Sequence, residues 1–95
     1  MGRLDVADLR QAYLEHMMDE PGAPLEPFVE RASRGQLGPV EPGALRGFLQ
    51  ALLRDMVGSI RAQAEANPDL AREEGQRVEE AEEEVARLID LYGAC

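Results

Sequence analysis

The residues of this chain with the greatest chemical capacity are its single histidine and the carboxylates that follow it. His16 stands three residues before Asp19 and four before Glu20, so on a helix the imidazole and a carboxylate could face one metal ion. Di-iron helix bundles need a Glu three residues before each such His, and Tyr13 occupies that position here. A lone His near the C-terminal end of a helix is more commonly explained by its favourable interaction with the helix dipole. The sequence therefore predicts neither a metal site nor a cofactor.

The only cysteine, Cys95, is the last residue of the sequence. A nucleophilic thiol needs a base held beside it, and a chain terminus is a poor support for such a pair because packing seldom fixes it. The sequence also contains no Gly-rich phosphate loop, nucleophile elbow or Cys/His cluster. One cysteine cannot form an internal disulfide, which suits a reducing compartment. These observations predict a protein that is not an enzyme.

A run of five glutamates stands near the C-terminus and is interrupted once, by Ala81. It comprises Glu79, Glu80, Glu82, Glu83 and Glu84. We interpret the run as the solvated outer side of a helix, where Arg87 is spaced to pair with Glu83. The alternative is a docking surface for a basic protein, in which case the chain would act as an acidic decoy that mimics nucleic acid.

The composition predicts a single all-α domain that spans residues 1–95. The chain contains no Thr or Trp, whereas the helix formers Ala, Leu, Glu and Arg dominate. Its formal net charge of −9 disfavours contact with phosphate backbones, so we expect no nucleic-acid partner. The sequence has no apolar run long enough to cross a bilayer and no apolar signal region, so we expect no membrane partner and a cytoplasmic location. The absence of Lys is typical of GC-rich coding and indicates a bacterial source.

A long amphipathic helix over residues 42–66 is the element around which the others must pack. Pro42 is expected in its first turn. A loop over residues 35–43 precedes it, and Leu37 and Val40 are expected to hold that loop against the core. The apolar positions of the helix recur at steps of three and four residues, and they are Leu45, Phe48, Leu49, Leu52, Leu53, Met56, Val57 and Ile60.

Two shorter helices are expected before the long one. The first covers residues 6–18 and begins after Asp5, which can cap it, with Asp8 at the third helical position as in a capping box. The second covers residues 27–34, begins at a proline and ends before Gly35, a residue suited to a C-terminal cap.

The last helix is expected over residues 68–92, and Asn67 alone separates it from the long helix. So short a joint predicts an antiparallel hairpin of the two helices. The apolar seam of the last helix keeps the alternating three- and four-residue spacing of a coiled coil and consists of Val78, Ala81, Val85, Leu88 and Tyr92. We expect the hairpin to be tightest around Val85–Tyr92 and looser near Asn67.

The long helix also carries a stripe of small residues nearly opposite its apolar face. These residues are Gly47, Ala51, Gly58 and Ala62. Two glycines on one line of a helix suggest close approach of another helix, from the same chain or from a second subunit, because Gly is otherwise costly there. Arg54 and Arg61 border the stripe and could pair with acidic groups of the docked helix. We predict these six residues as a candidate interface.

The first functional hypothesis is therefore a non-enzymatic helical module for protein–protein interaction, regulation or assembly. The partner would be another protein or a second copy of the chain, so that a homo-oligomer is expected. The alternative is a bundle that binds a small apolar ligand between Tyr13, Met17, Phe28 and Phe48.

Overall fold

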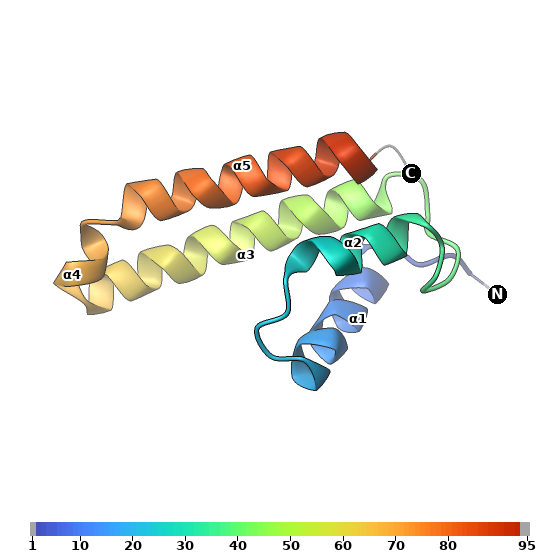
Figure 1. Cartoon of the computed structure of the whole chain (residues 1–95), viewed down its shortest axis with the longest axis horizontal. Coiled ribbons are helices and arrows are strands. Elements are labelled where there is room, and N and C mark those ends of the chain that lie inside the picture. Colours follow the sequence, from blue (N-terminus) through green and yellow to red (C-terminus); the bar gives the residue numbers. More distant parts are fainter. Residues whose placement is uncertain (1, 94–95) are drawn as a thin grey trace.

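The computed structural model of the chain describes residues 2–93 and is all-α, as predicted. Its helices are α1 (Val6–Asp19), α2 (Leu25–Ser33), α3 (Ala44–Ala66), α4 (Pro68–Ala71) and α5 (Glu74–Tyr92). Helices α3 and α5 form the expected antiparallel hairpin, which extends over the whole length of the molecule (Figure 1). Helices α1 and α2 pack against the end of the hairpin where α3 begins and α5 ends.

The core lies where α1, α2, α3 and α5 meet. Its fully enclosed side chains are Leu9, Phe28, Val29, Leu45, Phe48, Leu49, Val85 and Leu88. Toward the other end, Ile60 and Ala64 of α3 and Ala81 of α5 are the only buried residues in the described part of the chain, and α4 contributes none. Apolar burial is thus concentrated opposite Val85–Tyr92, as the seam of α5 indicated.

The start of α1 follows the predicted capping box. The Asp5 carboxylate accepts a hydrogen bond from the Asp8 backbone N–H at 2.9 Å, and the Asp8 carboxylate accepts one from the Asp5 N–H at 3.1 Å. Leu4, one residue earlier, forms an isolated parallel β-bridge with Val40. Because Leu37 and Val40 both pack against the core, the loop before α3 is held in place as expected.

Helix α2 begins at Leu25, two residues earlier than predicted. Pro27 occupies its third position instead of its first, which costs no hydrogen bond because the first four N–H groups of a helix have no partner within it. Leu25 is buried and lies among the core residues, so the earlier start brings one more apolar side chain inside. Gly35 follows the helix with φ of +75°, as expected of a glycine at this end.

Helix α3 begins at Ala44, so the prediction that Pro42 lies in its first turn is wrong. Gly43 is the N-cap and takes a left-handed conformation with φ of +79°. The Ala44 N–H donates to the Glu41 carbonyl at 3.0 Å, which closes a turn over Pro42 and Gly43. The chain needs this turn because Leu4 already fixes the preceding residues by hydrogen bonds to Pro39 and Glu41.

The single helix predicted over residues 68–92 is divided into α4 and α5, with Arg72 and Glu73 between them. Asn67 caps α4 as predicted, since its side chain accepts a hydrogen bond from the Asp69 N–H at 3.0 Å. Figure 1 shows α4 across the end of the hairpin, where it packs on α3. One residue cannot reverse a chain between two long helices, so the reversal takes a second bend after Ala71.

Candidate functional site

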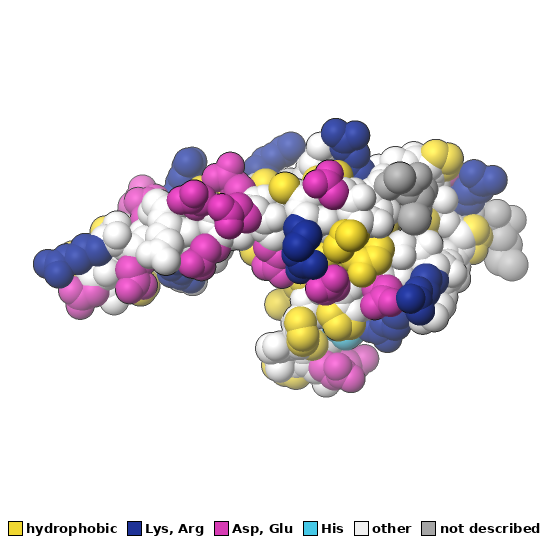
Figure 2. Space-filling model, turned by 45° about the horizontal axis from the view of Figure 1, so that its top comes forward, with side chains coloured by type: hydrophobic (Ala, Val, Ile, Leu, Met, Phe, Trp, Pro, Cys, Tyr) yellow, Lys and Arg dark blue, Asp and Glu magenta, His cyan; other side chains and the backbone are white. Residues whose placement is uncertain are grey.

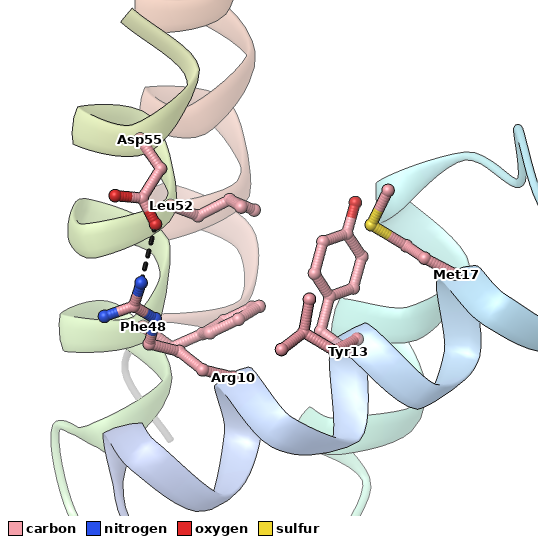
Figure 3. A pocket seen from close by; sticks show the side chains of 7 residues that line it. Arg10, Tyr13, Met17, Phe48, Leu52 and Asp55 are labelled. Atoms are coloured by element: carbon pink, nitrogen blue, oxygen red, sulfur yellow. Dashed lines mark hydrogen bonds and ion pairs between the residues drawn. The ribbon is translucent and has the colours of Figure 1, made fainter. Parts of the chain in front are cut away.

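An apolar pocket of about 150 Å³ opens between α1 and α3. Tyr13 and Met17 extend into it from α1, and Phe48 and Leu52 face them from α3 (Figure 3). The complete lining comprises Arg10, Tyr13, Leu14, Met17, Phe48, Leu52 and Asp55. Three of the four residues predicted for a ligand pocket, Tyr13, Met17 and Phe48, therefore lie around one cavity.

The pocket exists because α1 contacts α3 closely only near its own N-terminal end. Gly47 of α3 lies beneath Val6 there, and the Arg10 guanidinium forms an ion pair with the Asp55 carboxylate at 2.7 Å one turn later. The C-terminal part of α1 runs away from α3 (Figure 1), and Tyr13 and Met17 extend into the opening between the two helices.

An aromatic cluster forms the inner wall of the pocket. The Tyr13 ring meets the rings of Phe28 and Phe48 edge-on, with centroid distances of 5.2 and 5.7 Å. Phe28, the fourth residue of the predicted pocket, lies behind these rings in the core and does not line the cavity. Burial, and to a smaller extent the charge of Glu84, raises the pKa of the Tyr13 hydroxyl above its ordinary value of 10.0. The wall is therefore aromatic, and its hydroxyl ionises less readily than a free phenol.

Large apolar side chains are exposed on α1, and two of them, Leu14 and Met17, line the pocket. Leu14 is 56% exposed, Met17 44% and Met18 81%. Leu14 and Met18 are one helical turn apart, so their side chains are neighbours on the surface of α1. Apolar surface thus continues from the cavity onto the outside of the helix.

His16 lies behind the pocket, between Tyr13 and the second helix. Its Nδ1 atom lies 3.2 Å from a guanidinium nitrogen of Arg31, which can only donate, so Nδ1 accepts. The Nε2 atom is enclosed without a hydrogen-bond partner, and the Phe28 ring lies 5.5 Å from the imidazole between centroids. Within residues 2–93 no three His, Cys, Asp or Glu side chains are grouped so that they could hold a metal ion.

The stripe of small residues on α3 is divided by the packing of α1. Gly47 is covered by Val6 of the same chain, whereas Gly58 and Ala62 are exposed and nothing stands within 4 Å of a Cβ built on Gly58. Arg54 and Arg61 are exposed as well, and neither forms an ion pair with another residue in the range 2–93. The part of the stripe near α1 is an intrachain contact, and the remainder is open surface.

A second, shallow depression of about 490 Å³ lies along this exposed part of α3. It is lined by Gln50, Leu53, Arg54, Val57, Gly58 and Arg61. Leu53 and Val57 belong to the predicted apolar face of the helix, and both are only partly buried. Leu53 packs against the core, and no residue of α1 or α2 lines the depression.

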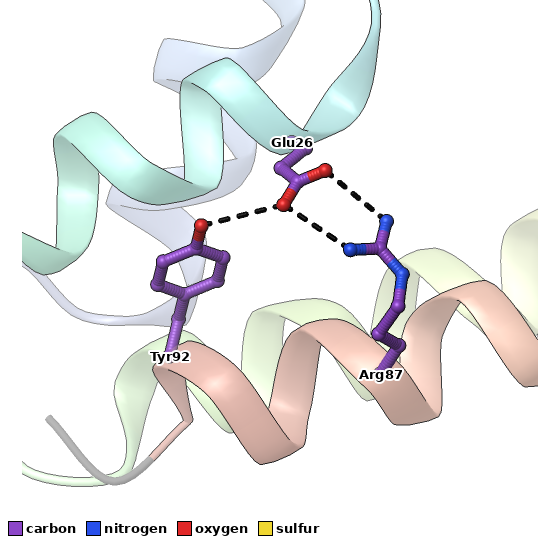
Figure 4. A network of polar contacts seen from close by, with 3 residues as sticks. All are labelled: Glu26, Arg87 and Tyr92. Carbon is purple, nitrogen blue, oxygen red and sulfur yellow. Dashed lines mark hydrogen bonds and ion pairs between the residues drawn. The ribbon is translucent and has the colours of Figure 1, made fainter.

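A polar network joins α2 to the end of α5 (Figure 4). The Glu26 carboxylate accepts two hydrogen bonds from the Arg87 guanidinium, each at 3.2 Å, and one from the Tyr92 hydroxyl at 3.3 Å. The hydrogen bond from Arg87 is the main reason that the pKa of Glu26 lies below its ordinary value. The pKa of Tyr92 is raised, first by burial and then by the charge of Glu26. Arg87 therefore pairs with Glu26 across the helices, although the sequence placed it beside Glu83.

The five glutamates of the acidic run are all exposed on α5, as expected for a solvated helix side. Figure 2 shows acidic side chains gathered along the hairpin on the side where α5 comes forward. Cys95 lies outside the described residues.

Sequence reasoning missed Arg10, Asp55 and Leu52 as members of the pocket. The ion pair of Arg10 and Asp55 joins residues 45 positions apart, and no local pattern reports such a contact. Leu14 and Met18 did carry a signal, because helical spacing places them beside, and not within, the side of α1 that Leu9 and Tyr13 share.

No helix in the described part of the chain is long and apolar enough to cross a membrane. Comparisons of the chain with protein-family models, with curated proteins and with solved structures gave no match.

Proposed function

We propose that this chain is a non-enzymatic interaction module that binds a helix of another protein through the pocket between α1 and α3. The pocket would receive one apolar side chain of that helix, and the exposed residues of α1 would contact the residues around it. The observation that carries the proposal is that apolar surface extends beyond the cavity onto Leu14 and Met18. Protein interfaces place an apolar anchor in a pocket and surround it with further contacts in the same way.

The two methionines at the end of α1 support this proposal. Met17 and Met18 are unbranched and polarizable, so they can adapt to side chains of different shape, and Met-rich surfaces are common where a protein binds helices. Leu14 and Met18 stand one turn apart and present a ridge against which a helix can pack. Scattered apolar residues need no explanation, but three large ones beside an apolar cavity form a contiguous patch.

The second candidate function is binding of a small apolar molecule in the same pocket. A cavity of about 150 Å³ in another protein takes up benzene, so the volume here is sufficient for a ligand of that size. Such a ligand would touch Tyr13, Phe48 and Leu52 and would leave Met18 free, because Met18 does not line the cavity. The two functions therefore differ in their dependence on Met18.

The test uses Met18→Ser, with Leu91→Ser as the matched control on α5, where Leu91 is 59% exposed. Binding is measured by amide chemical shifts with two sets of probes. One set consists of alanine-based helical peptides that each carry one Leu, Met or Phe, and the other consists of benzene and indole.

We expect the peptides to shift amides of α1 and α3, and Met18→Ser to weaken their binding several-fold while Leu91→Ser leaves it unchanged. If only benzene or indole shifts these amides, and Met18→Ser has no effect, the small-ligand function replaces the first. If neither set of probes shifts them, the pocket is not a binding site.

A further inference from the structure

One face of the α3–α5 hairpin carries α1 and α2, and no other element of the described residues 2–93 lies on the opposite face. Two contacts identify the covered face, namely the ion pair of Arg10 with Asp55 of α3 and that of Glu26 with Arg87 of α5. Val57 follows Asp55 by two residues, which turns its side chain about 160° around α3 and hence away from α1. On α5, Glu84 is directed toward α1, since its charge acts on Tyr13. Glu82 stands two residues before Glu84, so its side chain is turned away from α1 by the same angle.

On the open face, Val57 and Glu82 stand at the same level of the hairpin. The side chains of Gln63 and Arg77 are hydrogen-bonded at 3.2 Å and fix the register, since positions that sum to about 140 lie side by side in the two antiparallel helices. Arg61 then lies at the level of Glu79. The open face of the hairpin therefore has a defined order of side chains on both helices.

Over the stretch that Arg54 and Arg61 span, the charges on this face are separated by helix, and the exposed Glu65 follows one turn after Arg61. The α3 side carries Arg54 and Arg61 beside the shallow depression, and both are exposed. The α5 side carries Glu79 and Glu82, which are exposed as well. Between the two lines of charge lie Val57 and Val78, which are partly buried, and Leu53 and Ile89 extend this strip where they pack against the core. A basic line, an apolar strip and an acidic line thus run side by side along the hairpin.

We infer that two copies of the chain pair through this face, with α3 of each copy lying on α5 of the other. A twofold axis parallel to the hairpin brings the basic line of one copy against the acidic line of the second, so that Arg61 meets Glu79 of the second copy. The pairing is reciprocal, as closed twofold symmetry requires. It produces a four-helix bundle in which all adjacent helices are antiparallel.

The charge pattern also excludes the other way of stacking two hairpins. If α3 lay on α3 of the second copy, Arg54 of one copy would meet Arg61 of the other. The two α5 helices would then also lie on each other, and their glutamates would be in contact. Like charges placed in contact cost free energy and select against such a register. The separation of charges by helix therefore specifies which helices meet.

The size of the face is adequate for a dimer. Helix α3 has 23 residues and is about 34 Å long at 1.5 Å per residue, and two helices side by side are about 20 Å wide. The face thus offers about 700 Å² from each copy, close to the usual share of about 800 Å² per partner in a specific interface. Its apolar strip is narrow. The charged lines fix the orientation of the two copies more than they add to the affinity of the dimer.

This dimer rests on the proposed function only in assuming that the chain acts by association with a protein. It uses the side of α3 opposite the pocket. The experiment is the mass in solution, measured by light scattering after gel filtration with reductant present, for the full chain of 10.5 kDa. The variants are Arg61→Glu and the double variant Arg61→Glu with Glu79→Arg. The control is Arg72→Glu, which makes the same charge change at an exposed position outside the face.

We expect twice the monomer mass for the natural sequence and for Arg72→Glu. For Arg61→Glu we expect the dissociation constant of the dimer to rise at least tenfold, which shifts the chain toward monomer. The double variant should form a dimer again. Circular dichroism must show the same helix content for all of them. A monomer at concentrations up to about 1 mM, where even weak association is populated, would overturn the inference. A dimer that Arg61→Glu leaves intact would overturn it too. Because Arg61→Glu leaves the pocket untouched, peptide binding there succeeds or fails independently.

Discussion

Gly47 of α3 lies directly beneath Val6 of α1, so that a Cβ atom at position 47 would stand 2.9 Å from Val6 Cγ2. Carbon atoms do not approach one another this closely without displacement. The absence of a side chain at Gly47 therefore lets α1 begin against α3, and the ion pair of Arg10 with Asp55 continues that contact one turn later. The position of the pocket depends on this contact.

Gly47→Ala is expected to destabilise the chain, whereas the matched substitution Gly58→Ala is expected to stabilise it. Alanine favours a helix by about 1 kcal/mol over glycine at both positions. At Gly47 the added methyl group must displace the stiff side chain of Val6, and overpacking of this kind costs about 1–3 kcal/mol. The free energy of unfolding, measured by urea denaturation, should fall for Gly47→Ala and rise by about 0.5–1 kcal/mol for Gly58→Ala. Equal effects at the two positions would show that α1 does not pack closely on Gly47.

The Glu26–Arg87 pair predicts a stability difference that depends on pH. The pKa of Glu26 is lowered in the folded state, mainly by the hydrogen bond from Arg87, so the carboxylate contributes stability above its ordinary pKa of 4.5. That contribution is lost as the pH falls through the lowered pKa of the folded state. Arg87→Gln should therefore be less stable than the natural sequence at about pH 7, and the difference should disappear at about pH 2.

The control for this experiment is Arg77→Gln. Arg77 donates between helices too, through a single hydrogen bond where Arg87 forms two, and its acceptor is the uncharged side chain of Gln63. Both variants lose one positive charge, so the general effect of net charge is the same. If the two variants show the same dependence on pH, the titration of Glu26 is not its cause.

Both tyrosines of the chain are expected to titrate at higher pH in the folded protein than in the unfolded one. Burial is the main cause for Tyr13 and for Tyr92, and nearby carboxylates add to it. A raised pKa means that the neutral phenols stabilise the fold up to their ordinary pKa of 10.0 and that this stabilisation is lost at more alkaline pH. Ultraviolet absorbance of tyrosinate, compared with and without urea, measures both shifts, and Tyr13→Phe leaves Tyr92 to be followed alone. Identical curves in the two solvents would contradict the burial of these hydroxyls.

Local signals predicted the helix ends where a side chain acts on its own backbone. Asp5 and Asp8 form the capping box that their spacing indicated, and Asn67 caps the next helix as expected. The prediction failed at Pro42 because the β-bridge of Leu4 with Val40 fixes the chain just before it, and this bridge joins residues far apart in sequence. It also failed between α4 and α5, because the bend there serves the reversal of the whole hairpin.

The sequence predicted only part of the candidate site, again because local patterns do not report contacts between residues far apart in the chain. Apolar side chains such as Tyr13 and Phe48 could be recognised as neighbours from the faces of their helices, and they do meet. The angle at which α1 leaves α3 could not, because it follows from the glycine beneath Val6 and from the ion pair of Arg10 with Asp55. That angle decides that a pocket, and not a closed core, lies beside Phe48.

The hairpin is expected to be less stable at the end near α4 than at the end near α1. Leu49 lies in the main core and is fully buried, whereas Ile60 is 8% exposed and outside that cluster. Leu49→Ala should lower the free energy of unfolding by about 3–4 kcal/mol, and Ile60→Ala by about 2 kcal/mol, because a sparsely packed site can collapse around the lost atoms. Amide hydrogen exchange of the natural sequence should be fastest in α4 and the adjoining turns, since few buried apolar contacts oppose their local opening. If Ile60→Ala costs as much as Leu49→Ala, and α4 exchanges as slowly as the helices around Leu49, stability is distributed evenly along the hairpin and this prediction is wrong.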